Sequence, residues 1–197
     1  MQRMQPLASS ISYFPAPRNQ NFCSQCGATL VRLIPPDDTR MRDVCNQCGA
    51  IHYQNPRMVV GTIPVWNDQI LLCKRAIEPR YGYWTLPAGF LELGESSAAG
   101  AQRETMEEAG LPCEIGPLFS VIDVPQADQI HCFFLTRIDE PILAPGPETL
   151  EAHWVSEADI PWSDIAFRTI SLTLERFFED RRRGSFGVHY AALQKRT

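Results

Sequence analysis

A helix that carries three crowded carboxylates constrains this chain more than any other feature. Small and apolar residues recur at helical spacing from Ser96 to Ala109, with a serine as N-cap and Gly110 as the stop. Glu104, Glu107 and Glu108 then share an arc of about 100° on one side of that helix. They lie in its last turn, where the helix dipole favours cations over anions.

Helix stability alone disfavours this arrangement, because like charges three and four residues apart each cost a few tenths of a kcal/mol. A bound hard cation reverses that balance, since carboxylate oxygens are the ligands that Mg²⁺ accepts. For the three glutamates taken alone, a solvated acidic helix face is the simpler interpretation. The residues around them decide between the two.

The glutamates belong to a longer pattern, Gly89-Phe-Leu-Glu-Leu-Gly-Glu95, then seven residues, then Arg103-Glu-Thr-Met-Glu-Glu-Ala-Gly-Leu111. This 23-residue stretch resembles the signature of the Nudix hydrolase family at every invariant position. A match of that length is far more specific than a short glycine motif. We call this stretch, Gly89 to Leu111, the Nudix box. Thr105 occupies a position in it that is usually aliphatic in the family. Ala88, directly before the box, occupies a position where many members have glycine.

The resemblance implies an α/β fold, an α/β/α sandwich around a mixed sheet, with the box forming a loop, a helix and a loop. In this arrangement Glu95 supports Arg103 or contributes indirectly to metal binding. The implied Mg²⁺ or Mn²⁺ ligands are Glu104, Glu107, Glu108 and the backbone near Gly89. Such ions neutralise a diphosphate and lower the pKa of a bound water, from which a carboxylate takes the proton.

The box leaves the catalytic base open. ADP-ribose-type relatives often use a glutamate from a loop after the box, and Gly146-Pro-Glu148-Thr-Leu-Glu151 offers two candidates. Glu148 lies in what we expect to be a flexible segment, which suits a residue that closes on substrate, and we favour it. Glu151 is expected to precede a short strand near Trp154. Either glutamate could instead be a solvated loop charge, and Glu104 is the next candidate.

Two C-x2-C-G units precede the box, at Cys23–Gly27 and Cys45–Gly49. Their separation predicts a zinc ribbon in which four thiolates hold a structural Zn²⁺. A redox pair or a disulfide would need only one such unit. The ligands are therefore expected to be Cys23, Cys26, Cys45 and Cys48. The other three cysteines, Cys73, Cys113 and Cys132, lie in apolar runs and are expected in the core.

The whole chain divides into three regions by pattern. Residues 1–20 are expected to be a disordered lead, residues 21–53 the zinc ribbon, and residues 54–197 the Nudix domain. In the last region strand-like and helix-like runs alternate, which indicates α/β or α+β architecture. One strand-like run, Met58 to Trp66, contains Pro64, which suggests an edge position or a bulge.

A zinc ribbon ahead of a Nudix domain resembles a subgroup that contains FAD and ADP-ribose pyrophosphatases. NADH pyrophosphatases share the pairing, but the motif they carry after the box is missing between Gly116 and Gln126. We therefore expect ADP-ribose or FAD as substrate, with an NADH or dinucleotide pyrophosphatase as the alternative. Candidate substrate contacts are Tyr81, Tyr83, Trp84 and Arg75, the aromatic rings either stacking on a base or packing in the core.

Charge and composition exclude several other classes. The net charge is −5 and the pI about 5.4, so the chain has no general footprint for nucleic acid or for an anionic membrane. No apolar stretch suits a membrane span and no export signal is recognised, so a cytoplasmic location is expected. A nucleic-acid-binding ribbon on a non-catalytic Nudix scaffold stays open as an alternative, although an intact box argues against it. A homodimer completed by the ribbon is expected.

Overall fold

The computed structural model describes residues 20–194. Contacts divide the chain between Asn55 and Pro56 into two units, and each is described by itself. The predicted disordered lead lies outside the described residues except for Gln20. None of the described helices is long and apolar enough to span a membrane.

The first unit is a small antiparallel sheet of β1 (Leu30–Leu33), β2 (Arg42–Cys45) and β3 (Ile51–His52). Each cysteine pair occupies a tight turn beside it. Gly27 donates its N–H to the Cys23 carbonyl and Gly49 does the same to Cys45, both at 2.9 Å. Both glycines have positive φ, 76° and 74°, a region that other residues rarely adopt. The glycines therefore let the backbone turn beneath the sulfurs.

The second unit contains a five-stranded mixed sheet in the order β12-β9-β10-β4-β8. The parallel pairs are β12 with β9 and β10 with β4, and the other two pairs are antiparallel. The strands are β4 (Arg57–Ile63), β8 (Ala88–Phe90), β9 (Glu114–Val124), β10 (Gln129–Arg137) and β12 (His189–Ala192).

A second, antiparallel sheet has the order β11-β6-β5, with β7 also paired to β6. Its strands are β5 (Val65–Trp66), β6 (Gln69–Arg75), β7 (Trp84–Thr85) and β11 (Thr149–Val155). The helices are α1 (Ser97–Ala109) and α2 (Arg168–Arg183). Three short 3-10 turns complete the unit, at Pro125–Ala127, Glu157–Asp159 and Trp162–Asp164.

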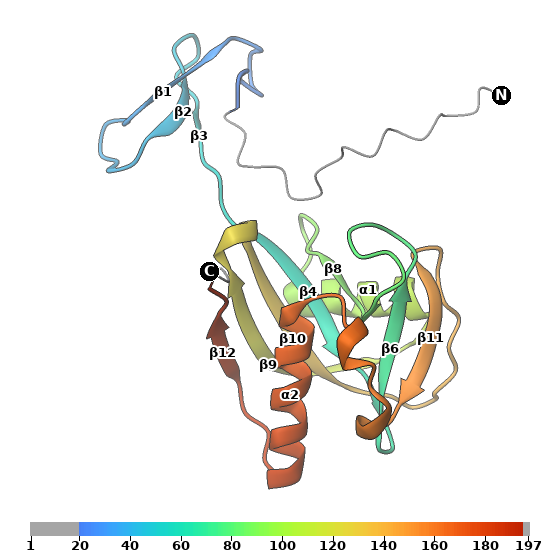
Figure 1. The fold of residues 1–197 in the computed structure, drawn as a ribbon. Helices are drawn as coiled ribbons and strands as arrows, with labels where there is room; N and C mark the ends of the chain where they lie inside the picture. Colours follow the sequence, from blue (N-terminus) through green and yellow to red (C-terminus); the bar gives the residue numbers. More distant parts are fainter. Residues whose placement is uncertain (1–19, 195–197) are drawn as a thin grey trace, which may run out of the picture. The chain divides into compact units, whose positions relative to one another are not determined.

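The two helices lie on opposite faces of the mixed sheet (Figure 1). Side chains alternate along each strand, so Val60 on β4 faces the α1 core while Ile63 faces the α2 core. A third cluster joins the end of α1 to the second sheet through Leu71 and Cys73. The three layers form the predicted α/β/α sandwich, and the metal-box helix is one of its outer layers.

Several predicted elements are confirmed. The α1 helix runs from Ser97 to Ala109 with Ser96 as N-cap, and Cys73, Cys113 and Cys132 are buried. Pro64 does not lie inside a strand: β4 ends at Ile63 and β5 begins at Val65, so the proline divides the predicted run Met58 to Trp66 into two strands. Because Pro64 follows Ile63, the last paired residue of β4, its missing N–H removes no hydrogen bond between β4 and its neighbouring strands.

One buried histidine makes the stability of this unit depend on pH. His131 on β10 is 8 % exposed, and its Nε2 contacts Gln129 Oε1 at 2.9 Å while its Nδ1 has no hydrogen-bond partner among the described residues. Burial lowers its pKa from 6.5 to about 4. Between those values the unfolded chain holds a proton that the folded chain lacks, so stability falls as the pH drops.

We expect this histidine to remove on the order of 2 kcal/mol of stability between pH 7 and pH 5. Replacing His131 with Leu should remove that part of the pH dependence. Urea unfolding of both proteins at the two pH values measures it. An unchanged difference between pH 7 and pH 5 in the variant would show that other groups cause the loss.

Candidate active site

The helix α1 is fixed at both ends and along its buried face. Ser96 Oγ accepts from the Ala99 N–H at 3.1 Å, and Gly110, at φ 60°, donates its N–H to the Met106 carbonyl at 2.8 Å. On the buried face, the Thr105 hydroxyl lies 2.6 Å from that of Thr62 on β4. A threonine is therefore accommodated at this usually aliphatic position, because the Thr62 hydroxyl on β4 forms a hydrogen bond with it.

Arg103 gathers the carboxylates of the box. Its Nε and Nη2 donate to the two oxygens of Glu95 at 3.1 and 2.7 Å, and its Nη1 donates to Glu104 at 2.7 Å and to Glu107 at 3.0 Å. Nη2 also reaches the Phe90 carbonyl at 3.1 Å. The two-pronged contact lowers the pKa of Glu95 and fixes the plane of the guanidinium.

Glu108 and Glu104 lie deeper than Glu107. Glu108 is only 6 % exposed, and burial raises its pKa to about 8, partly opposed by the Ala88 N–H, which donates to it at 3.2 Å. Burial likewise raises the pKa of Glu104, against the influence of Arg103. A Cβ on Gly89 would lie 2.4 Å from the Glu104 carboxylate, so any larger residue at position 89 would displace that carboxylate.

These residues fit a divalent cation, although their carboxylates are not gathered as ligands. Among residues 20–194, the four cysteines are the one group of three or more His, Cys, Asp or Glu side chains placed closely enough to hold a metal ion, with their sulfurs within 4.8 Å of one another. Glu104 and Glu107 are instead turned to Arg103, and Glu108 to Ala88. A half-buried acidic cluster around one guanidinium has the oxygen donors that hard cations require.

The structure separates the two candidate bases. Glu148 is among the charges that raise the pKa of both Glu104 and Glu108. Its backbone is held in a turn, with Thr149 donating to the Gly146 carbonyl at 3.1 Å and Ala76 donating to the Glu148 carbonyl at 2.8 Å. The expected flexible segment is therefore a bonded turn, although the Glu148 side chain is exposed.

Glu151 has a different environment. It lies inside β11, which begins at Thr149, so the expectation that it precedes the strand is wrong. Lys74 donates to it at 2.8 Å and lowers its pKa, and His153 Nε2 lies 3.3 Å away. Its carboxylate is thus paired with Lys74 and contacts His153, both on the second sheet.

The predicted substrate contacts lie on β6, β7 and the segment between them. Burial lowers the pKa of Arg75, and the nearby charges of Glu108 and Glu148 oppose that shift. The Arg75 guanidinium also lies over the Phe167 ring, 5.2 Å from its centroid. Tyr83 has Arg80 over its ring at 5.3 Å. Phe167 was not predicted as a neighbour of the site, because it enters from the far end of the chain.

Trp84 is part of the packing. It packs against the α2 core, His153 meets its ring edge-on at 5.4 Å, and the Lys74 ammonium lies 5.5 Å from the ring centroid. The Trp84 carbonyl also accepts from Ala166 at 2.8 Å. These contacts favour the core role over base stacking for this side chain.

The four ribbon cysteines form a second candidate metal centre. The Cys23 and Cys48 sulfurs are 3.6 Å apart, and those of Cys26 and Cys45 are 3.5 Å apart. Tetrahedral ligands with Zn–S bonds of about 2.3 Å would be about 3.8 Å apart. All four sulfurs lie within 4.8 Å of one another, so the set fits a closed tetrahedral metal site.

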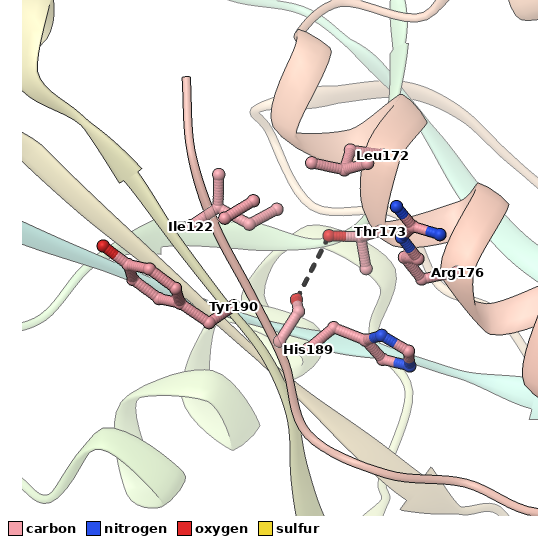
Figure 2. A pocket seen from close by; sticks show the side chains of 8 residues that line it. Ile122, Leu172, Thr173, Arg176, His189 and Tyr190 are labelled. Carbon is pink, nitrogen blue, oxygen red and sulfur yellow. Dashed lines mark hydrogen bonds between the residues drawn. The ribbon is translucent and has the colours of Figure 1, made fainter. Parts of the chain in front are cut away.

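A hollow of about 170 Å³ lies in the second unit, between α2, β9 and β12 (Figure 2). Its nitrogen-bearing side chains already have partners: Arg176 donates to Glu179 at 2.7 Å, and His189 Nε2 lies 2.7 Å from Asp180 Oδ2. The β12 edge is opposite the β8 edge, where Ala88 and Gly89 meet the box helix. This hollow is therefore separate from the candidate active site.

Comparisons with known proteins identify the family and the fold. A family model described as the NUDIX domain matches residues 55–173, and one described as Nudix N-terminal, a zinc-ribbon model, matches residues 21–54. A crystal structure of a NUDIX hydrolase from Nitrosomonas europaea is 45% identical, covers 89% of this chain and 100% of that one, and has a TM-score of 0.85. An ADP-ribose pyrophosphatase from Streptococcus suis, 20% identical, shares the fold with a TM-score of 0.56 over 71% of this chain and 100% of that one.

The curated relatives are longer proteins. The NAD-capped RNA hydrolase NudC of Escherichia coli O1:K1 is 27% identical over 147 residues, which are 73% of this chain and 54% of that protein. The chain thus spans about half the length of the curated relatives it matches. The NUDIX domain model covers more than half of this chain, and the chain belongs to the Nudix family.

Proposed function

We propose that this protein is a metal-dependent Nudix hydrolase that cleaves the diphosphate bond of a nucleoside diphosphate derivative. The observation that carries the proposal is that Arg103 binds Glu104 and Glu107 while Glu108, on the same side of α1, is buried against Ala88 of β8. Burying a carboxylate without a cationic partner is costly, and a divalent ion would offset that cost. Mg²⁺ or Mn²⁺ is the proposed ion.

When bound, the ion would neutralise the diphosphate and make a water acidic enough to be deprotonated. Glu104, Glu107 and Glu108 would hold it, with the backbone near Gly89 as a further ligand. Arg103, fixed by Glu95, would keep the carboxylates in place. The half-buried Arg75 cation would bind a phosphate oxygen of the substrate, and Glu148 would take the proton from the attacking water.

ADP-ribose or FAD is the proposed substrate class. The subgroup resemblance of the ribbon and Nudix domains supports it, as does the Arg75 cation, which is near Glu108 and Glu148 and whose backbone N–H donates to the Tyr83 carbonyl at 2.9 Å. Tyr83 with Arg80 is the proposed contact for the base or ribose end of the substrate. An NAD-type dinucleotide, free or at the end of an RNA, is the second candidate. The similarity to the NAD-capped RNA hydrolase NudC favours it.

A substrate panel tests these proposals directly. ADP-ribose, FAD, NADH, diadenosine polyphosphates and an NAD-capped RNA should be compared with Mg²⁺ and with Mn²⁺ as kcat/KM. We expect ADP-ribose or FAD to give the highest value. A higher value for NADH or the capped RNA would establish the second candidate instead. Hydrolysis of none of them, in protein that binds the metal, would favour a non-catalytic ligand-binding scaffold.

For the ribbon we propose a structural Zn²⁺ held by the four cysteines. Purified protein should contain about one zinc per chain, and chelation should unfold the ribbon before hydrolysis is lost. Cys48→Ser should abolish zinc binding, whereas Cys113→Ala, at a buried cysteine outside the ribbon, should retain it. Zinc-free protein with an unchanged ribbon spectrum would exclude this assignment.

We also propose that the protein is a homodimer to which the ribbon contributes. The positive charges of the ribbon's arginines are balanced by the negative charges of its aspartates, which does not favour nucleic acid. The ribbon also exposes apolar side chains, which favours contact with another protein surface. These side chains are Phe22, Ile34, Met41 and Tyr53. Light scattering of the full chain should give twice the chain mass, and a single chain mass at micromolar concentration would contradict the dimer.

A further inference from the structure

The segment that carries Glu148 lies directly against the end of the metal-box helix. Ala144 donates its N–H to the Ala109 carbonyl at 2.8 Å, and Gly146 donates its N–H to the Glu108 carbonyl at 3.2 Å. These are carbonyls of the last helical turn, which have no partner within the helix. Another part of the chain thus binds the C-terminal end of α1, at the residues next to the proposed metal ligands.

The contact is too close for any side chain at Gly146. A Cβ there would lie 1.9 Å from the Glu107 carbonyl oxygen and 3.1 Å from the Glu107 carbonyl carbon. The obstacle is helix backbone, which cannot rotate away as the end of a side chain could. The backbone of Gly146 does not require positive φ, so space is the reason for glycine here.

The same glycine begins the turn that presents Glu148. Thr149 donates to the Gly146 carbonyl at 3.1 Å, which closes a four-residue turn with Pro147 and Glu148 at its centre. Ala76, next to Arg75, donates to the Glu148 carbonyl at 2.8 Å. The turn that carries Glu148 is therefore bonded to the end of α1 on one side, through Gly146, and to Ala76, directly after β6, on the other.

We propose that residues 144–149 form a backbone clamp whose purpose is to hold Glu148 at a fixed position relative to Glu104 and Glu108, and that Gly146 is its positioning residue. The proposal rests on the function proposed above, with Glu148 as base. The geometry of proton transfer tolerates little displacement, and a shift of about 1 Å can cost 100-fold in rate. A residue that sets the distance between the clamp and the helix should therefore act on turnover through Glu148.

The first test is Gly146→Ala, with Gly187→Ala as the matched control, since a Cβ on Gly187 meets nothing within 4 Å. We expect Gly146→Ala to lower kcat by about 100-fold with KM and the Mg²⁺ concentration for half-maximal rate nearly unchanged. Gly187→Ala should keep the parent kcat. A parent-like kcat in Gly146→Ala would overturn the clamp.

A second variant covers the case in which Gly146→Ala does not fold. Pro147 is exposed, and Pro147→Gly loosens the turn without adding bulk. It should lower kcat several-fold while leaving Mg²⁺ dependence unchanged. A Pro147→Gly variant with the parent kcat would count against the clamp in the same way.

The decisive measurement repeats both changes in a Glu148→Gln background. If the clamp acts through Glu148, its loss should change the residual kcat by less than about twofold there, because residues that act as one unit are not additive. If the two changes lower kcat in the Glu148→Gln background as much as they do in the parent, the clamp is refuted while Glu148 can still be the base. A Glu148→Gln variant with the parent kcat would refute the base and the clamp together. A parent protein that hydrolyses no diphosphate substrate would instead refute the proposed function.

Discussion

Replacing Glu108 with Gln should lower kcat by roughly a thousandfold at saturating Mg²⁺, because a metal ion contributes several kcal/mol to such a reaction and each 1.36 kcal/mol is tenfold. Gln keeps the size of the side chain and an oxygen that can accept the Ala88 N–H. What it removes is the charge of a proposed ligand. Glu107→Gln should have an effect of the same order.

The two variants should differ in stability without metal. Glu108 is buried and burial opposes its charge, so Glu108→Gln should be at least as stable as the parent. Glu107 is more than half exposed and pairs with Arg103, so Glu107→Gln should lose a few tenths of a kcal/mol. Glu175→Gln, at an acidic residue of α2 outside the box, is the control. Parent-like turnover in either box variant at saturating metal would overturn the metal-ligand assignment.

The sequence predicts those parts of the site that depend on local spacing. The helix from Ser96 to Gly110 follows from its cap, its periodicity and its stop, and both cysteine turns follow from spacing and glycine alone. Each is set by interactions within about fifteen residues, where residue type and position determine the conformation.

Features that depend on long-range pairing are not predictable in the same way. The length of β11, which places Glu151 inside a strand, is set by its pairing with β6 more than seventy residues earlier in the chain. The bonded turn at Glu148 likewise depends on Ala76 and on the end of α1. Three prolines near this segment indicate a loop, and the sequence offers no local signal that the loop binds the helix.

The Thr105 hydroxyl shows the same limit on a smaller scale. In the sequence it is only a departure from a usually aliphatic slot. In the fold it lies 2.6 Å from the Thr62 hydroxyl, on a strand 43 residues away. Because a buried hydroxyl needs a partner, the pair explains the departure, but either threonine alone gives no reason to expect the other.

Glu148→Gln should lower kcat by roughly 10² to 10⁴, the range for removal of a general base. Glu151→Gln should leave kcat nearly unchanged, since its carboxylate is paired with Lys74 and His153 on the second sheet. Both variants replace a glutamate with a glutamine, so they differ only in the position of the carboxylate that is lost. If Glu148 is the base, its loss should also remove the acidic limb of the pH-rate profile.

Metal binding must be separated from base catalysis in that experiment, because protons compete with the metal for Glu104 and Glu108, whose pKa values burial raises. The profile should therefore be measured as kcat at a saturating Mg²⁺ concentration established at each pH. Glu148→Gln should then lose turnover while its Mg²⁺ dependence stays close to that of the parent. If Glu148→Gln and Glu151→Gln both keep the parent kcat and the acidic limb, the base lies within the box. Glu104 is then the first residue to replace, because it is the half-buried carboxylate that Arg103 turns toward Gly89.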